Sequence, residues 1–227
     1  MRIFEWRICA PRGDLMRGAL ILALIVAVVV VGLALLPLPR TRPAAANINT
    51  NQATSSPVEF EFMQGGTVAL DLEAGNYDIV PSSDNKVTIK YDLFGNTSTR
   101  SVRIGSGVNG RNARVVIESP ANGFHAEIAV PDKSNLYVRL TAGNLNIDGI
   151  EGSKDVEGRA GNLTIDVGDP AQYGPVYASV SSGNIQAHAW STQKSGLMRS
   201  FHMSGPGHYG LRAHIGAGNL VLVSKAK

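Results

Sequence analysis

Hydrophobic and polar residues alternate along most of the chain after residue 57, and a period of two predicts β-strands. The alternating segments are separated by turns rich in Gly, Asn, Asp, Ser and Pro; they include Val58–Phe62, Val68–Leu72, Val87–Tyr91, Val102–Ile104, Val115–Ile117 and Ile128–Val130. No stretch in this region has a convincing 3.6-residue period, so we expect almost no helix there. About 170 residues is ample for one all-β domain with a continuous core.

One short phrase recurs five times: alternating apolar residues, a small residue, Gly-Asn, and alternating apolar residues again. The instances centre on Gly75-Asn76, Gly143-Asn144, Gly161-Asn162, Gly183-Asn184 and Gly218-Asn219. Gly and Asn adopt positive φ more readily than other residues, which suits a tight corner between two strands. Around the third corner we expect six residues to share one face: Val156, Gly158, Ala160, Leu163, Ile165 and Val167. The repeat therefore predicts β architecture and carries no catalytic signature.

The spacing of the corners favours a solenoid over a sandwich. Successive corner asparagines are 68, 18, 22 and 35 residues apart, and 68 is close to three units of about 22. Coils of similar length with superposable corners are expected when each coil stacks on the one before it. We expect the longest late gap, between Asn184 and Asn219, to hold a loop. A hairpin-built sandwich remains the alternative, since primed hairpin turns also use Gly and Asn.

An apolar run without charge, residues 18–36, precedes the β region. At about 1.5 Å per helical residue it would be roughly 29 Å long, close to the hydrocarbon thickness of a bilayer. Arginines precede it, which favours a cytoplasmic N-terminus and an exported C-terminal domain. A cleaved signal peptide is the alternative, with cleavage after Ala46 in the small-residue run Ala44–Ala46.

The sequence thus divides into four parts: a cytoplasmic arm (1–17), a transmembrane signal-anchor helix (18–36), a flexible linker (37–57) and a β-solenoid domain (58–227). The linker is rich in Pro, Ala, Asn, Thr and Ser, a composition typical of a spacer.

Overall charge says little about partners once the membrane segment is set aside. The chain has 21 Lys+Arg and 18 Asp+Glu, but six of the arginines flank the apolar run together with two of the acids. The remainder carries 15 basic and 16 acidic residues, so nothing suggests nucleic-acid binding. The one cysteine, Cys9, falls in the predicted cytoplasmic arm, and the exported domain must therefore be held together without a disulfide.

Several short motifs resemble the bacterial "putative adhesin" or "toastrack" family of domains of unknown function. The resemblance rests on Ile128–Lys133, Leu140–Ile147, Gly149–Gly152, Ala160–Ile165, Ser181–Ile185 and Gly216–Leu220, and it covers roughly residues 60–223. It implies a right-handed, single-stranded β-helix displayed at the bacterial envelope. It implies no catalytic set, so no site residue is carried over.

Clusters that could hold chemistry are few. The five histidines, at positions 125, 188, 202, 208 and 214, lack metal-ligand spacing and are expected to be ordinary exposed residues. Six acids lie near the third corner, at positions 148, 151, 155, 157, 166 and 169. Calcium binding or acid–base catalysis is the less favoured interpretation of these acids. Ordinary solvent-exposed charge is favoured, because Lys154 and Arg159 are interspersed among them. Tyr177, Trp190 and Tyr209 could stack on sugar rings, although edge packing is the simpler reading. We expect no cofactor and no metal.

The outward rows around the second and third corners form the candidate binding face: Arg139, Thr141, Asn146, Asp148, Arg159, Thr164 and Asp166. We therefore predict a non-catalytic, single-pass protein of the bacterial cytoplasmic membrane whose C-terminal domain lies outside the cytoplasm. Stacked β-coils offer flat faces and open edges for a partner, either an envelope glycan or another envelope protein. The alternatives are a carbohydrate-active β-helix enzyme and an envelope-stress sensor that signals through its cytoplasmic arm.

Overall fold

The computed structural model describes residues 57–93, 102–118 and 123–225. Within these residues the helical segments are two short 3-10 turns, η1 (Pro170–Gln172) and η2 (His188–Trp190). The strands are β1 (Val58–Glu61), β2 (Thr67–Ser82), β3 (Lys86–Leu93), β4 (Arg103–Asn109), β5 (Asn112–Glu118), β6 (Phe124–Pro131), β7 (Asn135–Ile147), β8 (Lys154–Asp166), β9 (Tyr173–Ala187), β10 (Thr192–Ser204) and β11 (Tyr209–Val223). The prediction of an all-β domain is confirmed.

The predicted arm (1–17) and membrane segment (18–36) lie outside the described residues, as does nearly all of the predicted linker. In the part of the chain that the structure does describe, no helix combines the length and apolar character needed to cross a bilayer.

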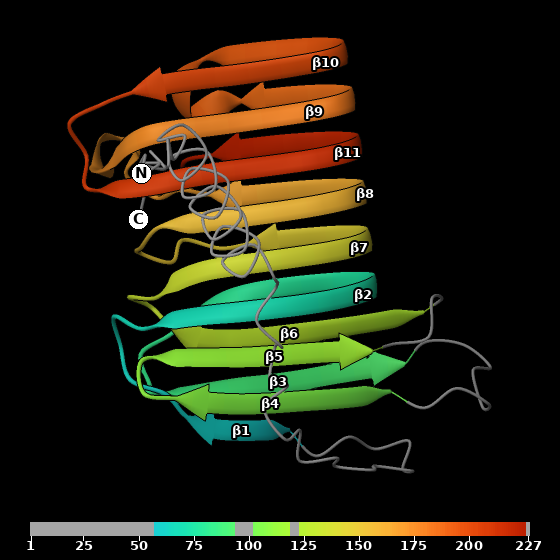
Figure 1. Cartoon of the computed structure of the whole chain (residues 1–227), viewed down its shortest axis with the longest axis vertical. Helices are drawn as coiled ribbons and strands as arrows, with labels where there is room; N and C mark the ends of the chain where they lie inside the picture. The colour runs from blue at the N-terminus through green and yellow to red at the C-terminus, as the bar shows by residue number, and fades with distance from the viewer. Residues whose placement is uncertain (1–56, 94–101, 119–122, 226–227) are drawn as a thin grey trace, which may run out of the picture. The chain divides into compact units, whose positions relative to one another are not determined.

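The long strands fold back on themselves, so their two halves belong to different layers. The first half of β2, residues 67–72, pairs with β5, whereas its second half, residues 76–82, pairs with β6. Figure 1 shows this turn at the right-hand side of β2, β7, β8, β11, β9 and β10. The strand order is β1-β3-β6-β2-β7-β8-β11-β9-β10, and β5 with β4 continues the layer beside the first half of β2. The apolar core lies between the two layers.

The five Gly-Asn corners stack in register, but their spatial order differs from their order in the chain. Gly75 pairs with Gly143, and Gly143 with Gly161. Gly161 then pairs with Gly218, and Gly218 with Gly183, because β11 lies between β8 and β9 and is parallel to both. The expectation that each coil stacks on the one before it is wrong for the corners at Gly183 and Gly218, because Gly218 lies between Gly161 and Gly183. Corners with the same local geometry are interchangeable as neighbours, so the phrase alone could not specify which ones meet.

The two long gaps between corners are filled by strands rather than by further coils or a loop. The 68-residue gap holds β3 to β6, which lie beyond β2 and include the antiparallel pairs β3–β6 and β4–β5; β3 also pairs antiparallel with β1, which precedes the gap. The expectation of three coils there is therefore wrong. The gap between Asn184 and Asn219 holds β10, which runs antiparallel to β9 along its whole length, so the expected loop is also a strand.

Alternation along the strands places the core as predicted, except at the corners themselves. Val156, Leu163 and Ile165 are fully buried, and Val167 is 4% exposed. Ala160 was expected to face inward with them but is exposed, as is Ala217 at the equivalent position. The turn occupies the alanine as well as Gly-Asn, so the inward alternation stops at Gly158 and resumes at Leu163.

A ladder of asparagine side chains runs along the stacked corners. Asn144 donates to Asn76 and Asn162 donates to Asn144, each at 2.8 Å from Nδ2 to Oδ1. Asn219 donates to Asn162 at 2.7 Å, and Asn184 donates to Asn219 at 2.8 Å. Each inner asparagine is thus both donor and acceptor, which explains why the repeat keeps asparagine beside glycine.

Asn162→Ala is expected to destabilise the domain by about 1 kcal/mol more than Asn76→Ala. Asn162 loses one donated and one accepted hydrogen bond, whereas Asn76, at the end of the ladder, loses one accepted bond. Urea unfolding of the two variants gives the difference in the free energy of unfolding. Equal losses would show that the ladder contributes nothing beyond each residue's own preference for the corner.

Candidate binding face

Outward side chains form a charged face on one layer, over β5 and the first halves of β2, β7 and β8. We call this set the charged face; it comprises Asp71, Glu73, Arg114, Glu118, Arg139, Thr141, Glu157 and Arg159. Its residues point outward because they alternate with buried ones, as Arg139 does with Val138 and Leu140.

Charges of opposite sign lie opposite each other across the strands of this face. The register puts Asp71 beside Arg139, and Arg139 beside Glu157. Nε of Arg139 lies 3.8 Å from Oε2 of Glu157. Arg114 donates to Oδ2 of Asp71 from Nε at 3.0 Å and from Nη2 at 2.5 Å. Exposed ion pairs of this kind add little to stability, so their groups can exchange one partner for another at small cost.

A hollow of about 580 Å³ lies over the charged face. Its lining includes the carboxylates of Asp71, Glu73, Glu118 and Glu157, and the guanidinium groups of Arg139 and Arg159. Thr141 and four apolar residues complete the lining: Leu72, Val116, Ile117 and Leu140. Carboxylates accept hydrogen bonds and guanidinium groups donate them, so this surface can bind a ligand with many hydroxyl groups or a protein surface of mixed charge.

The structure divides the predicted binding residues between the two layers. Arg139, Thr141 and Arg159 line the hollow. The other four follow the corners, three of them on the second strand halves and Asp148 directly after β7: Asn146, Asp148, Thr164 and Asp166. They cannot belong to the same face, because the chain changes layer at Gly143-Asn144 and Gly161-Asn162.

Asp166 is not part of any outward row. It is 5% exposed, and its Oδ1 accepts hydrogen bonds from the backbone N–H of Gly168 at 2.9 Å and of Lys225 at 3.1 Å. The expectation of an outward Asp166 is therefore wrong, because the strand ends there and its carboxylate caps the following turn. Asp148 accepts a hydrogen bond from Nζ of Lys225 at 2.7 Å, which raises the pKa of that ammonium.

Sequence reasoning missed Asp71, Glu73, Arg114 and Glu118. The signal for the first two was present, because aligning Gly75 with Gly143 places Asp71 beside Arg139 and Glu73 beside Thr141. Nothing local could have placed Glu118, since β5 has no Gly-Asn corner.

The most unusual polar group is a buried amine, which sequence reasoning also missed. Lys154 is 2% exposed, and its Nζ donates to the carbonyl oxygen of Ile150 at 2.5 Å and to the hydroxyl of Tyr173. Burial lowers the pKa of Lys154 to about 8, although the charges of Asp166 and Glu151 act in the opposite direction. Burial also raises the pKa of the Tyr173 hydroxyl, which donates to the carbonyl oxygen of Gly152 at 3.2 Å. Lys154 thus ties the loop before β8 to the start of β9.

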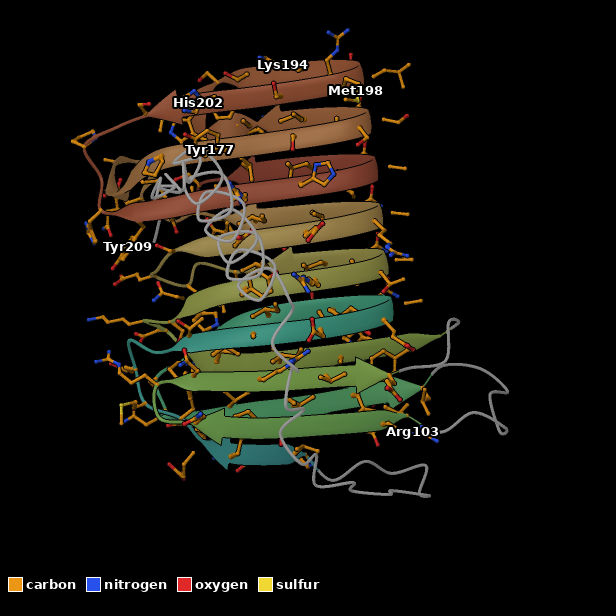
Figure 2. The ribbon with its side chains drawn as sticks, viewed as in Figure 1. Arg103, Tyr177, Lys194, Met198, His202 and Tyr209 are labelled. Carbon is orange, nitrogen blue, oxygen red and sulfur yellow. The ribbon has the colours of Figure 1, made fainter. Side chains whose placement is uncertain are left out.

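The histidines are distributed singly over the domain. His125 contacts Oδ2 of Asp78 at 2.8 Å, and His214 contacts the hydroxyl of Ser179 at 2.8 Å. His202 stacks on Tyr177 with ring centroids 4.4 Å apart, and Figure 2 shows this pair on β9 and β10. In residues 57–93, 102–118 and 123–225, no three His, Cys, Asp or Glu side chains are placed to hold a metal ion together.

The three aromatic residues considered for sugar stacking have different environments. Tyr177 is 50% exposed but has one ring face against His202. Trp190 packs on Phe201 with ring centroids 5.8 Å apart, and Tyr209 packs on Tyr173 at 5.9 Å. Trp190 and Tyr209 therefore serve packing.

Comparison with known proteins finds no family. No protein-family model matches the chain, and no curated protein matches it either. Among solved structures, the chain is similar to one described as a "putative cell adhesion protein" from Clostridium sporogenes ATCC 15579. The two are 13% identical with a TM-score of 0.48, and the match covers 75% of this chain and 99% of the other.

Proposed function

We propose that this chain is a single-pass envelope protein that displays a β-helix-like domain outside the cytoplasm and binds a partner without chemical turnover. The observation that carries the proposal is the charged face, whose residues of alternating charge line a hollow of about 580 Å³. The ligand class that fits is a polyhydroxylated envelope polymer, because carboxylates and guanidinium groups together satisfy hydroxyl donors and acceptors.

The architecture supports a display role. Strands stacked in register, with a hydrogen-bonded ladder along their corners, hold outward side chains at the regular spacing of a sheet. A rigid face lowers the ordering cost of binding. The apolar segment 18–36 would supply the membrane anchor.

The test uses the segment Ala44–Lys227, which forms a compact unit by itself. It is mixed with insoluble envelope polysaccharide and with peptidoglycan, and both retention and release of new reducing ends are recorded. Retention without release is the expected result. Release of reducing ends that is lost on substitution of Glu157 or Asp71 would replace the binding proposal with a carbohydrate-active enzyme.

Arg139→Glu is expected to weaken retention by about tenfold or more, the effect of losing one charged hydrogen bond. Arg139 lies in the hollow and pairs with Glu157. The matched control is Lys90→Glu, because Lys90 is an exposed cation on β3 paired with Glu127 at 3.3 Å. Equal retention of the two variants would show that the charged face is not the binding surface.

A further inference from the structure

The last strand of the sheet, β10, presents an edge that no other described strand covers. It pairs with β9 from Thr192 to Ser204 and with no second strand in the described part of the chain. Figure 1 shows it at the top of the sheet, beyond β9. A strand edge of this length carries backbone donors and acceptors that can pair with another extended strand. Two of its carbonyl oxygens accept side-chain hydrogen bonds within the strand, Ser200 from Nζ of Lys194 at 2.6 Å and Ser195 from Nε of Arg199 at 2.8 Å, so a partner strand would have to displace these two side chains.

Two adjacent apolar side chains are exposed in the middle of this edge strand. Leu197 is 70% exposed and Met198 is 81% exposed, the largest values among the exposed large hydrophobic residues of the described chain. Met198 has a φ of 51°, a left-handed conformation that side chains other than glycine adopt at a cost. Figure 2 shows Met198 at the corner side of β10, pointing away from the sheet. Exposed apolar groups held in a costly conformation indicate a contact surface.

Met198 is the central residue of β10. The strand has 13 residues, Thr192–Ser204, so six lie on each side of Met198. The corner of β10 lies close to Met198, because Gly196 pairs with Gly183, the corner glycine of β9. A two-fold axis through Met198 would exchange the two halves of β10 and keep the corners of two copies aligned. Antiparallel pairing is therefore possible on both sides of the corner, with Thr192 opposite Ser204 of the second copy.

The end of the core beside β10 is incompletely closed. Trp190, Phe201 and Met203 pack against the core but remain partly exposed. Lys194 crosses this end, since it pairs with Ile185 on one layer and its Nζ donates to the carbonyl oxygen of Ser200 on the other at 2.6 Å. A second copy placed end to end would cover these apolar side chains with its own, which is the favourable term in most protein association.

The position of Arg199 disfavours a register centred one residue later than Met198. Pairing about Met198 places Lys194 opposite His202 of the second copy, and Arg199 opposite Leu197. A register centred one residue later would place the two Arg199 side chains opposite each other, which is unfavourable. The acidic strand β1 at the other end of the sheet is a weaker partner, because it has only four residues.

We propose that two copies of this chain associate end to end through antiparallel pairing of β10 with β10, with a two-fold axis at Met198. The sheet then continues from one copy into the other, and the charged faces of the two copies lie on opposite sides of the pair. This surface is separate from the charged face, so the dimer does not depend on the proposed ligand.

The test measures association of the full-length chain in detergent micelles by sedimentation and by amide hydrogen exchange. The wild type is expected to form dimers, with exchange of residues 192–204 slowing as protein concentration rises. Met198→Glu places two carboxylates opposite each other and is expected to weaken dimerisation by about tenfold or more. The control is Val108→Glu, at an exposed apolar residue of β4 that is 46% exposed.

A cysteine variant tests the position of the axis directly. In a Cys9→Ser background, Met198→Cys is expected to give a disulfide-linked dimer under mild oxidation, because directly opposite residues in antiparallel strands bring Cβ atoms close. Val108→Cys is the control. The proposal is overturned if the chain stays monomeric, if Met198→Glu and Val108→Glu associate as well as the wild type, or if the two cysteine variants cross-link equally. Open-ended filaments instead of dimers would also overturn it, since they indicate head-to-tail contact.

Discussion

Gly161→Ala is expected to cost at least about 4 kcal/mol of the free energy of unfolding, a large part of the roughly 5–15 kcal/mol that stabilises a typical domain. A Cβ atom at Gly161 would lie 1.7 Å from the carbonyl oxygen of Gly143 on the neighbouring strand. That oxygen belongs to the backbone of a paired corner and cannot move without breaking the register on both sides. The φ of 125° adds a second cost, because side chains other than glycine rarely adopt it.

The matched control is Gly110→Ala, in the turn between β4 and β5. Gly110 also has positive φ, at 58°, but nothing lies within 4 Å of the position of its Cβ atom. The Gly110→Ala variant should therefore lose only about 1 kcal/mol of the free energy of unfolding, the cost of placing alanine in a left-handed conformation. Denaturant unfolding of the segment Ala44–Lys227 compares the two. Similar losses would mean that backbone conformation, and not close approach between corners, explains the repeated glycine.

Lys154 is expected to make the domain more stable as pH rises from 8 to 10. Its folded pKa, about 8, lies below the ordinary lysine pKa of 10.5. Between these values the unfolded chain binds a proton that the folded chain has released, so deprotonation favours folding and stability rises with pH. The contribution of Lys154 over this window is about 2 kcal/mol. Above pH 10 the raised pKa of Tyr173 acts in the opposite direction, because the unfolded chain then loses its phenolic proton first.

Lys154→Met isolates this effect, because methionine fills similar volume without the amine. The difference in unfolding free energy between wild type and variant should shift by about 2 kcal/mol in favour of the wild type from pH 8 to pH 10. Lys90→Met, at an exposed lysine of β3, controls for loss of a positive charge. A wild-type profile parallel to that of Lys154→Met would show that the buried amine does not titrate in this range.

The buried amine also shows where sequence reasoning stops. Lys154 precedes Val156 and Gly158 by the two-residue period of the strand, so alternation was consistent with an inward position that the sequence analysis did not assign to it. A lysine at such a position is normally read as exposed, because a buried charge is costly without partners. Its partners are the carbonyl oxygens of a loop and the hydroxyl of Tyr173 on another strand. Only the assembled domain brings these groups together.

The binding face was predictable only in part for a related reason. The sequence identified Arg139, Thr141 and Arg159 as outward residues near two corners, and they do line one hollow. It also joined to them residues after the corner, such as Thr164, which lie on the other layer. Alternation reports whether a side chain points in or out. It does not report which layer carries the strand half, and the acids from β2 and β5 enter the site only through pairing.

The sequence by itself determined the all-β class, the places where the long strands turn, and most of the side chains that fill the core. These properties are local, because the period of two sets the facing of each residue and glycine permits the corner conformation. The tertiary structure decided the neighbours: β11 between β8 and β9, β3 to β6 beyond β2, and β10 along the outer edge of β9. Five corners with the same phrase can stack in any order at similar local energy. The order is therefore set by the connections between strands and by the packing of the shared core, which no single repeat contains.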